Sequence, residues 1–563
     1  MYYTESKDIL FFVPVGMEEP EELRKAFEYS LCDGDEGVRY LESVKERGVQ
    51  MSPPEDGGYL TNTNQNVSFL RNPAQDAIIG IAGAYANPAG LGFMSQGWHL
   101  GFDIQSAYQT RSDASFFRPF ALGTVNGVKN SADGNKTFEG KATAPVIPSF
   151  DLARVGERWF ASFHFGITGG GGKCKFADGL PSFESQVAML PVLTSVLAPN
   201  AVSGYSMDTH MQGRQYYFGG QFGVGYKITP NFNVSVGGRV LYAQCNYYGY
   251  VRNIGLTVNT PAGAMQVPAT TFFENQNLPD FAALVSDKEL NCDQTGWGFT
   301  PIISADWKVG KLNLAAKYEF KTRLRLKNQA GVNTSGLEEY DDGKKVKADV
   351  PAILALGARY ELLENLRLNA GFHYYFDKQA TQNENRHNYL KKGGWEVLAG
   401  AEVDVTNRWT VSAGWQSTNY GLGENSQFIS DMSFVTNSNS LGIGARFQLR
   451  KKVALNIAYF KTFYKHYERK HEDFYHLKGT FNSMLTPMVD QLKGAATQIG
   501  AALQNPSLPE EQRAIYQQKL NTLTNELGAA QNIANGLQNY STAGSDNFHR
   551  TNDVFGLGLE IDF

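Results

Sequence analysis

Basic residues at strand spacing are the part of this sequence most able to bind a charged ligand. Four lie at odd positions of one predicted strand and a fifth on the polar face of another: Lys317, Lys321, Arg323, Arg325 and Arg239. Because strand side chains alternate between two faces, we expect all five to point toward one interior. There they could bind a carboxylate ligand. The alternative is that they only solvate a polar lumen, and the sequence leaves both interpretations open.

Other patterns suggest chemistry less specifically. Gly169-Gly-Gly-Gly-Lys173 resembles a phosphate-binding loop, but the first glycine, the following Ser or Thr and the helix are missing. His466, His471 and His476 are spaced five apart, so neither a helix nor a strand would place all three on one face. No Gly-x-Ser-x-Gly motif occurs. We therefore expect no enzyme, no cofactor and no metal site.

The elements that position these residues alternate in polarity. Near the C-terminus, Phe555, Leu557, Leu559 and Ile561 alternate with glycine or carboxylate residues, and the sequence closes on Phe563. A terminal strand of this kind is typical of an outer-membrane β-barrel, whose outer face is apolar and whose lumen is polar. The same alternation recurs in segments that begin near residues 98, 232, 312, 366, 395 and 453.

Short turns and long polar loops succeed each other along the sequence. The turns fall near residues 155–157, 229–231, 309–311, 363–365, 405–407 and 450–451. Six short turns and seven long loops join fourteen strands, and connections segregated in this way favour a bacterial membrane barrel over a soluble β-sandwich. We therefore predict an all-β fold, a 14-stranded antiparallel transmembrane β-barrel in the cell outer membrane.

Composition agrees with this class. The 563 residues are 42% apolar and include 58 glycines, and no run of about 18 apolar residues predicts a transmembrane helix. The net charge of −5 gives no reason to expect a nucleic-acid partner. Residues 1–57 hold 14 acidic and 6 basic residues and lack the pattern of a signal peptide. We expect residues 1–56 to be an acidic extension outside the barrel, either upstream of the natural start or a small extra module.

One loop has helical rather than strand spacing. Between residues 468 and 550, apolar residues recur at helical spacing in two series, Leu485–Leu503 and Ile515–Leu537, separated by Pro506-Ser-Leu-Pro509. This pattern predicts an antiparallel helical hairpin in the last external loop. A shorter helical pattern covers Val187–Leu197 in an earlier long loop.

The four cysteines form no CxxC pair and predict no zinc site. A bridge between Cys245 and Cys292 across one outer loop is possible, but spacing alone does not fix connectivity.

Two motifs before the first strand carry a resemblance to a known family. Gly57-Gly-Tyr-Leu-Thr-Asn-Thr-Asn-Gln65 and Tyr85-Ala-Asn-Pro-Ala-Gly-Leu91 resemble the opening of the FadL/TodX family of outer-membrane transporters. In that family a plug segment ends in an Asn-Pro-Ala motif, here Asn87, Pro88 and Ala89; a second copy, Asn72-Pro73-Ala74, fits less well. The resemblance implies a plug over residues 57–92 inside a barrel over residues 93–563.

The resemblance also implies passive uptake of long-chain fatty acids or hydrocarbons by a monomer embedded in outer-membrane lipid. In that family the third strand opens the wall sideways. Here that strand runs from Trp159 to Thr168 and then reaches Gly169, Gly170, Gly171 and Gly172, which resist bending little. These glycines are our candidates for a lateral opening, with flexible loop as the alternative. The competing functions are an adhesion barrel that uses the helical hairpin and a membrane-embedded hydrolase.

Overall fold

The computed structural model describes residues 61–563 except 198–200, 277, 423–428 and 433. The predicted acidic extension, residues 1–56, and the first residues of the predicted plug lie outside the described residues.

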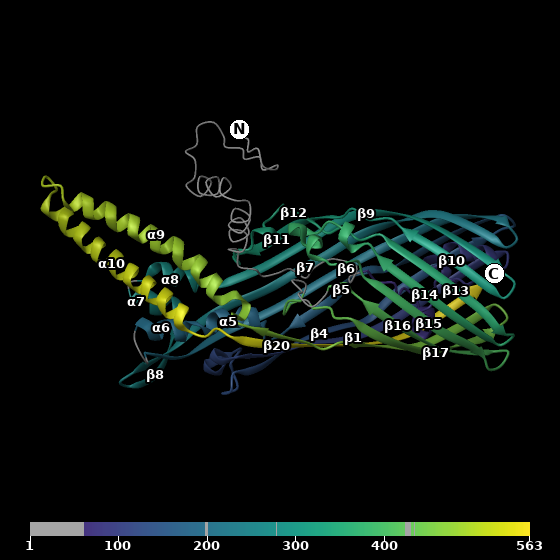
Figure 1. The fold of residues 1–563 in the computed structure, drawn as a ribbon, viewed down its shortest axis with the longest axis horizontal. Coiled ribbons are helices and arrows are strands. Elements are labelled where there is room, and N and C mark those ends of the chain that lie inside the picture. Colours follow the sequence, from purple (N-terminus) through teal and green to yellow (C-terminus); the bar gives the residue numbers. More distant parts are fainter. Residues whose placement is uncertain (1–60, 198–200, 277, 423–428, 433) are drawn as a thin grey trace.

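Fourteen long strands form a closed antiparallel barrel within the described residues (Figure 1). Strand β20 pairs with β1 from Asp562 opposite His99 to Gly544 opposite Phe117, which closes the sheet. The predicted 14-stranded antiparallel barrel is therefore confirmed. The barrel strands are β1 (Gly97–Phe117), β4 (Asn135–Val155), β5 (Trp159–Phe176), β6 (Val202–Thr229), β7 (Phe232–Thr260), β9 (Lys288–Val309), β10 (Leu312–Glu319), β13 (Ile353–Leu363), β14 (Leu366–Tyr375), β15 (Trp395–Asp404), β16 (Trp409–Asn419), β17 (Ser438–Arg450), β18 (Val453–Tyr464) and β20 (Gly544–Asp562).

The two ends of the barrel differ in their connections. Each of the six predicted turns joins two neighbouring barrel strands, and all six lie at one end, which we call the short-turn end. The other end, the long-loop end, carries the short strands and most helices. These elements are η3 (Arg118–Leu122), β2 (Gly123–Val125), β3 (Val128–Lys129), α5 (Pro181–Ala188), α6 (Leu190–Leu197), β8 (Gly263–Pro268), α7 (Ala269–Asn275), α8 (Pro279–Leu284), β11 (Arg325–Asn333), η4 (Glu338–Tyr340), β12 (Lys345–Lys347), η5 (Asp377–Gln379), η6 (Asn383–Tyr389), β19 (Tyr467–His471) and η7 (Phe474–His476).

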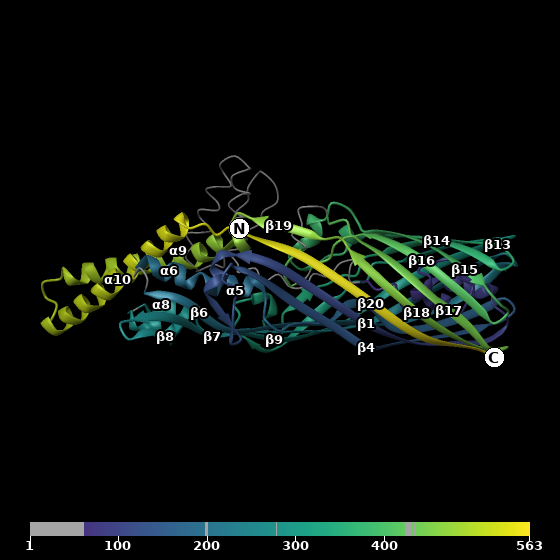
Figure 2. The same ribbon diagram turned by 90° about the horizontal axis from the view of Figure 1, so that it is seen from below.

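Two long helices extend from the long-loop end. Helices α9 (Leu477–Leu503) and α10 (Glu510–Asn539) pack against each other and project away from the barrel (Figures 1 and 2). Their bases pack on the largest apolar core of the described residues, which includes Phe474, Leu485 and Leu537. This core lies in the loop region because the barrel interior is mainly polar.

The outer surface of the barrel is an apolar belt. Exposed side chains of this belt on successive strands include Trp98, Phe102, Trp159, Phe163, Phe222, Val236, Trp297, Trp307, Leu356, Trp409, Ile443, Ile457, Phe555 and Leu557. In a soluble protein an exposed apolar surface of this extent would be an aggregation liability. Among the described residues, no helix is both long and apolar enough to span a bilayer.

Cysteine pairing differs from the possibility that the sequence left open. Cys245 on β7 is opposite Gln294, and Cys292 on β9 is opposite Tyr247, so the two cysteines lie on adjacent strands but are not opposite each other. All three of Cys174, Cys245 and Cys292 are buried.

Candidate ligand-binding site

Residues 61–94, called the inner segment, are surrounded by the barrel. They form α3 (Val67–Arg71), α4 (Gly83–Ala86) and η2 (Pro88–Phe93). Helix α3 contacts β16, β17, β18, β20 and β1, whereas α4 and η2 contact β4, β5, β6, β7 and β9. Contacts with strands on opposite sides of a closed sheet place the inner segment within the lumen.

The Asn-Pro-Ala motif is fastened to β9. Asn87 is buried, and its side-chain amide donates to the carbonyl of Ile78, 3.1 Å away, and to the carboxylate of Asp306. Its side-chain oxygen accepts from the N–H of Gly90 at 3.3 Å, which caps η2. The N–H of Ala89 donates to Oγ of Ser304 at 3.0 Å. The motif therefore joins the end of the inner segment to the barrel wall.

Glycines of the opposite wall form a seat for the inner segment. A Cβ built on Gly442 of β17 would lie 2.2 Å from the carbonyl oxygen of Leu70, and one on Gly400 of β15 would lie 2.0 Å from Oδ1 of Asn72. Glycine is needed at Gly442, because the close atom there belongs to the backbone and real Cβ atoms do not approach so closely. We call the full set the glycine seat: Gly357, Gly371, Gly400, Gly414, Gly442, Gly444 and Gly556.

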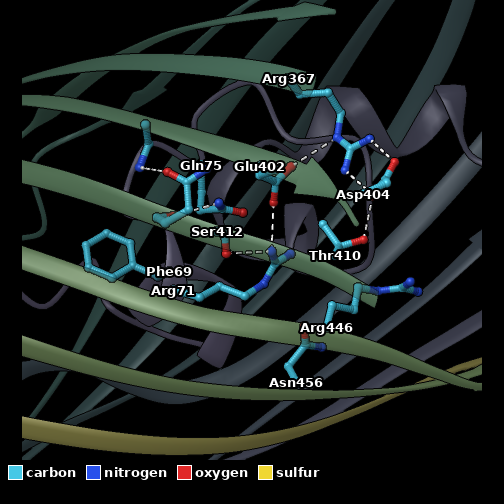
Figure 3. Close-up of polar contacts among 12 residues, drawn as sticks. Phe69, Arg71, Gln75, Arg367, Glu402, Asp404, Thr410, Ser412, Arg446 and Asn456 are labelled. Atoms are coloured by element: carbon cyan, nitrogen blue, oxygen red, sulfur yellow. Dashed lines mark hydrogen bonds and ion pairs between the residues drawn. The ribbon is translucent and has the colours of Figure 1, made fainter. Parts of the chain in front are cut away.

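A buried ion pair also holds the inner segment to this wall (Figure 3). Arg71 of α3 donates to Glu402 at 2.9 Å and to Oγ of Ser412 at 3.0 Å. Arg367 lies 3.5 Å from the same carboxylate and binds Asp404 through both terminal nitrogens at 2.5 and 2.6 Å. Removing one partner of a buried pair typically costs about 3–5 kcal/mol, because the other charge is left uncompensated. The inner segment is therefore a fixed part of the barrel.

The wall between β4 and β5 is interrupted. Pairing runs up to Phe150 opposite Phe165 and resumes only at Ala142 opposite Cys174. Residues 143–149 of β4 and 166–173 of β5 are not paired with one another, and we call this break the wall gap. Pro145 and Pro148 of β4 lie in it, and proline has no N–H to donate to a neighbouring strand.

All four candidate glycines lie in the wall gap. The register with β6 also shifts there, between Ile167 and Gly169 and again between Gly169 and Gly172. Gly170 and Gly172 have φ values of 94° and 70°, in the left-handed region that favours glycine. The glycine run therefore bends β5 away from the regular sheet.

The inner segment binds part of the strand edge that β4 leaves free. Thr61 forms an antiparallel bridge with Gly169, and the N–H of Asn62 donates to the carbonyl of Thr168 at 3.0 Å. Gln65 donates from its side-chain amide to the carbonyl of Ile167 at 2.9 Å. The bend in β5 is thus supported from inside, and it does not need β4.

The five predicted basic residues separate into two groups. Arg239 and Lys317 meet in the lumen, where both bind Glu319, at 2.9 and 2.8 Å, and lie over the ring of Tyr85. Lys317 also donates to the carbonyl of Tyr85 at 3.0 Å. These two cations therefore anchor the inner segment, and neither is left without a partner.

The other three basic residues do not share the predicted inward face. Strand β10 ends at Glu319, and the buried positions shift from odd to even numbers before β11 begins. Arg323 and Arg325 are consequently exposed, which corrects the expected parity. Lys321 and Arg325 both bind Asp349, at 3.5 and 2.5 Å. The sequence reasoning was wrong here because it continued one strand through a break.

An apolar cavity lies at the long-loop end. It contains ≈ 1320 Å³ of empty space, open solvent included. The outer ends of β6, β7 and β9 form its floor, and α5, α6, α8, α9 and α10 contribute to its walls. Its lining includes Phe183, Leu193, Phe281, Met432, Phe481 and Leu485. Met211 of this lining is opposite Phe176 on β5, close to the end of the wall gap at Cys174.

Lys288 is the cation in this apolar lining. It is half-buried at the start of β9, on the same face as the buried residues Leu290 and Cys292. Burial lowers the pKa of the Lys288 ammonium. Within the described part of the chain, this ammonium makes no hydrogen bond or ion pair. Lys288 is therefore better placed than the five predicted residues to meet an anionic group on an apolar ligand.

Sequence reasoning missed Lys288, the two prolines and the glycine seat. The prolines carried a readable signal, because proline inside a predicted barrel strand indicates a break in pairing. Lys288 carried none, because its apolar surroundings come from helices and strands distant in sequence.

The similarity of this protein to known proteins lies in its structure. No protein-family profile matches the sequence, and no curated protein does. Among solved structures, a FadL homologue of Pseudomonas aeruginosa matches with a TM-score of 0.53 at 13% identity, over 90% of this chain and 99% of that one. The toluene transporter TodX of P. putida matches with a TM-score of 0.47 at 12% identity, over 86% and 95% of the two chains. The chain therefore shares its fold with the FadL homologue of P. aeruginosa, as its resemblance to the FadL/TodX family implied.

Proposed function

We propose that this protein is an outer-membrane channel for passive uptake of hydrophobic compounds, either long-chain fatty acids or hydrocarbons. The observation that carries the proposal is the wall gap, which breaks an otherwise continuous barrel next to a fixed inner segment. The apolar belt supports a location in lipid, because lipid-facing strands present apolar side chains outward.

The inner segment acts as a plug that blocks movement along the barrel axis. Its residues are mostly buried, and they are tied to β9 by Asn87 and to β15 by Arg71. A ligand confined above such a plug leaves most easily through the wall. The wall gap is the lateral exit, and an apolar ligand that passes it enters the bilayer without crossing a polar lumen.

The apolar cavity at the long-loop end takes the ligand first. Its lining is mainly aliphatic and aromatic, as is usual for sites that bind small hydrophobic molecules. Lys288 binds the carboxylate when the ligand is a fatty acid, because a desolvated ammonium gains most from an anionic partner. A neutral hydrocarbon uses the same lining without Lys288.

The test fills the wall gap from both of its edges. Ala144→Trp adds bulk on β4, and Gly171→Val adds a β-branched side chain on β5 without substituting Gly170, whose Cβ would lie 2.5 Å from the carbonyl oxygen of Gln215. The double variant should insert normally and lose uptake of a labelled long-chain fatty acid and of toluene.

The matched control is Gly331→Val on β11, where the nearest atom to a new Cβ is 3.8 Å away. Uptake by the control should equal that of the parent. If a folded gap-filled variant takes up both compounds normally, the wall gap is not the exit and the proposal of lateral release is wrong.

The second candidate function is adhesion through the helical hairpin. The observation that favours it is the projection of α9 and α10 beyond the rest of the long-loop end (Figure 2). However, Phe481, Met484 and Ile533 of the two helices line the apolar cavity, which ties their bases to the ligand path. We therefore place uptake first.

A further inference from the structure

Four cations gather on the outer face of β4, β5 and β6 beside the wall gap. We call Lys141, Lys173, Lys175 and Arg214 the basic patch. Lys141, Lys173 and Lys175 are exposed, while their neighbours Ala142, Cys174 and Phe176 are buried. The side chains of the patch therefore point outward, away from the lumen and from the apolar cavity.

The strand register brings like charges directly opposite each other. Lys141 on β4 is opposite Lys175 on β5, and Lys173 on β5 is opposite Arg214 on β6. Like charges in cross-strand pairs destabilise a sheet. Desolvation lowers the pKa of nearby His210, and Lys175 and Lys173 lower it further.

Acidic residues compensate this charge only in part. Glu139 lies 3.2 Å from the ammonium of Lys141, and Asp293 lies 3.8 Å from Arg214. Both carboxylates are about half exposed, so these pairs are weak. In the part of the chain that the structure describes, neither Lys173 nor Lys175 has a hydrogen bond or ion pair for its ammonium. The basic patch therefore keeps an excess of positive charge.

The height of the basic patch on the barrel indicates its partner. On β5 the apolar belt contains Trp159, Phe163 and Phe165, and Lys173 and Lys175 follow further toward the long-loop end. A membrane strand of a tilted barrel needs about 9–11 residues to cross the hydrocarbon. Counted from Trp159, the lysines fall just beyond the hydrocarbon, at the level of lipid headgroups.

We propose that the basic patch binds the phosphate groups of an anionic glycolipid in the outer leaflet, at the upper margin of the wall gap. A phosphate between Lys141 and Lys175 replaces their mutual repulsion with two charge-assisted hydrogen bonds. The bound lipid covers the upper end of the gap from outside. This inference rests on the proposed membrane location, but it does not depend on any transported ligand.

The test measures lipid binding by the purified full chain in neutral detergent, with diphosphoryl lipid A as the probe. The charge-removing variant is K141Q/K173Q/K175Q, and the matched control is K311Q/K451Q/K452Q, which removes three exposed lysines at the short-turn end. Each lysine near a headgroup contributes about fivefold, so the patch variant should bind on the order of a hundredfold more weakly. The control should bind like the parent. Binding by the parent should also weaken as salt is raised.

Three comparisons separate the explanations. The parent should bind fully dephosphorylated lipid A only weakly, no better than the patch variant binds diphosphoryl lipid A. If the parent binds both lipids equally, recognition through phosphate is overturned. Strong competition by inorganic phosphate would identify a site for a free anion and overturn a lipid site. Equal lipid binding by parent and patch variant would overturn the site itself. Fatty-acid uptake is measured separately, on cells that carry the parent or each variant, so a failure of the uptake proposal is distinguished from a failure of lipid binding.

Discussion

Two walls of this barrel hold the same inner segment in opposite ways. The wall from β13 through β18 to β20 has nearly continuous ladders, and the glycine seat lets the inner segment approach it closely. The wall at β4 and β5 is interrupted, and the inner segment there supplies backbone hydrogen bonds that a neighbouring strand would otherwise make. The first wall fixes the segment, whereas the second depends on it.

This difference explains how one barrel can hold a segment firmly in its lumen and still be broken at its side. A strand edge without a partner leaves unpaired N–H and C=O groups, which are costly away from water. Thr61, Asn62 and Gln65 satisfy some of these groups from inside. The wall gap therefore persists only while the seat holds the rest of the inner segment in register with it.

The largest effect is expected from a substitution in the seat. In Gly442→Ala, the new Cβ meets the carbonyl oxygen of Leu70 at 2.2 Å. We expect a loss of roughly 1–3 kcal/mol in the stability of the docked segment, as for other overpacked cores. Ion conductance in planar bilayers should rise as the segment loosens.

The control for this substitution is Gly331→Ala, where the nearest atom is 3.8 Å away, and its conductance should match the parent. If Gly442→Ala has the same stability and the same low ion conductance as the parent, the two walls do not differ in how they hold the inner segment.

An intermediate effect is expected at Lys288, in the lining of the apolar cavity. Lys288→Met should weaken binding of a long-chain carboxylate by about tenfold and leave a neutral hydrocarbon unaffected, because only the charged hydrogen bond is removed. Lys493→Met on the exposed face of α9 is the control. Titration calorimetry with both ligands checks the difference, and equal losses for both would mean that Lys288 contributes packing alone.

The pH dependence follows from the same residue. An ammonium is charged below its pKa, and burial lowers the pKa of Lys288. Carboxylate binding should therefore be complete below the pKa of Lys288 and should fall as pH rises through it. This fall should occur at a lower pH than the ordinary lysine pKa of about 10.4. Lys288→Met should show no such fall.

The smallest effect is expected from the outer part of the helical hairpin. None of residues 496–524 is buried, whereas Phe481, Met484 and Ile533 at the base line the apolar cavity. Replacing residues 496–524 with a short flexible turn should change ligand uptake by less than about twofold, as for other changes to exposed surface. Loss of adherence to a surface or partner cell, with uptake intact, would instead support the adhesion function.

The sequence by itself determined the barrel. Alternation at Phe555, Leu557, Leu559 and Ile561 requires one apolar and one polar face, and six turns with seven long loops leave fourteen strands. These features are local, because the two faces of a strand follow from the alternation of neighbouring residues. The glycine run from Gly169 to Gly172 was also readable as a bend, although its function stays a proposal.

Only the tertiary structure decided which charges meet and which remain free. Arg239 and Lys317 share Glu319, and the break after β10 turns Arg323 and Arg325 outward. Lys288 looked unremarkable in sequence, because its cavity is assembled from helices and strands far apart in the chain. The burial and pairing of a charged side chain depend on strand register and on barrel closure, which are set by contacts between distant residues. A shift of one residue in register moves every side chain of a strand to the opposite face of the sheet. For that reason the sequence specified the barrel, and the folded barrel selected the site.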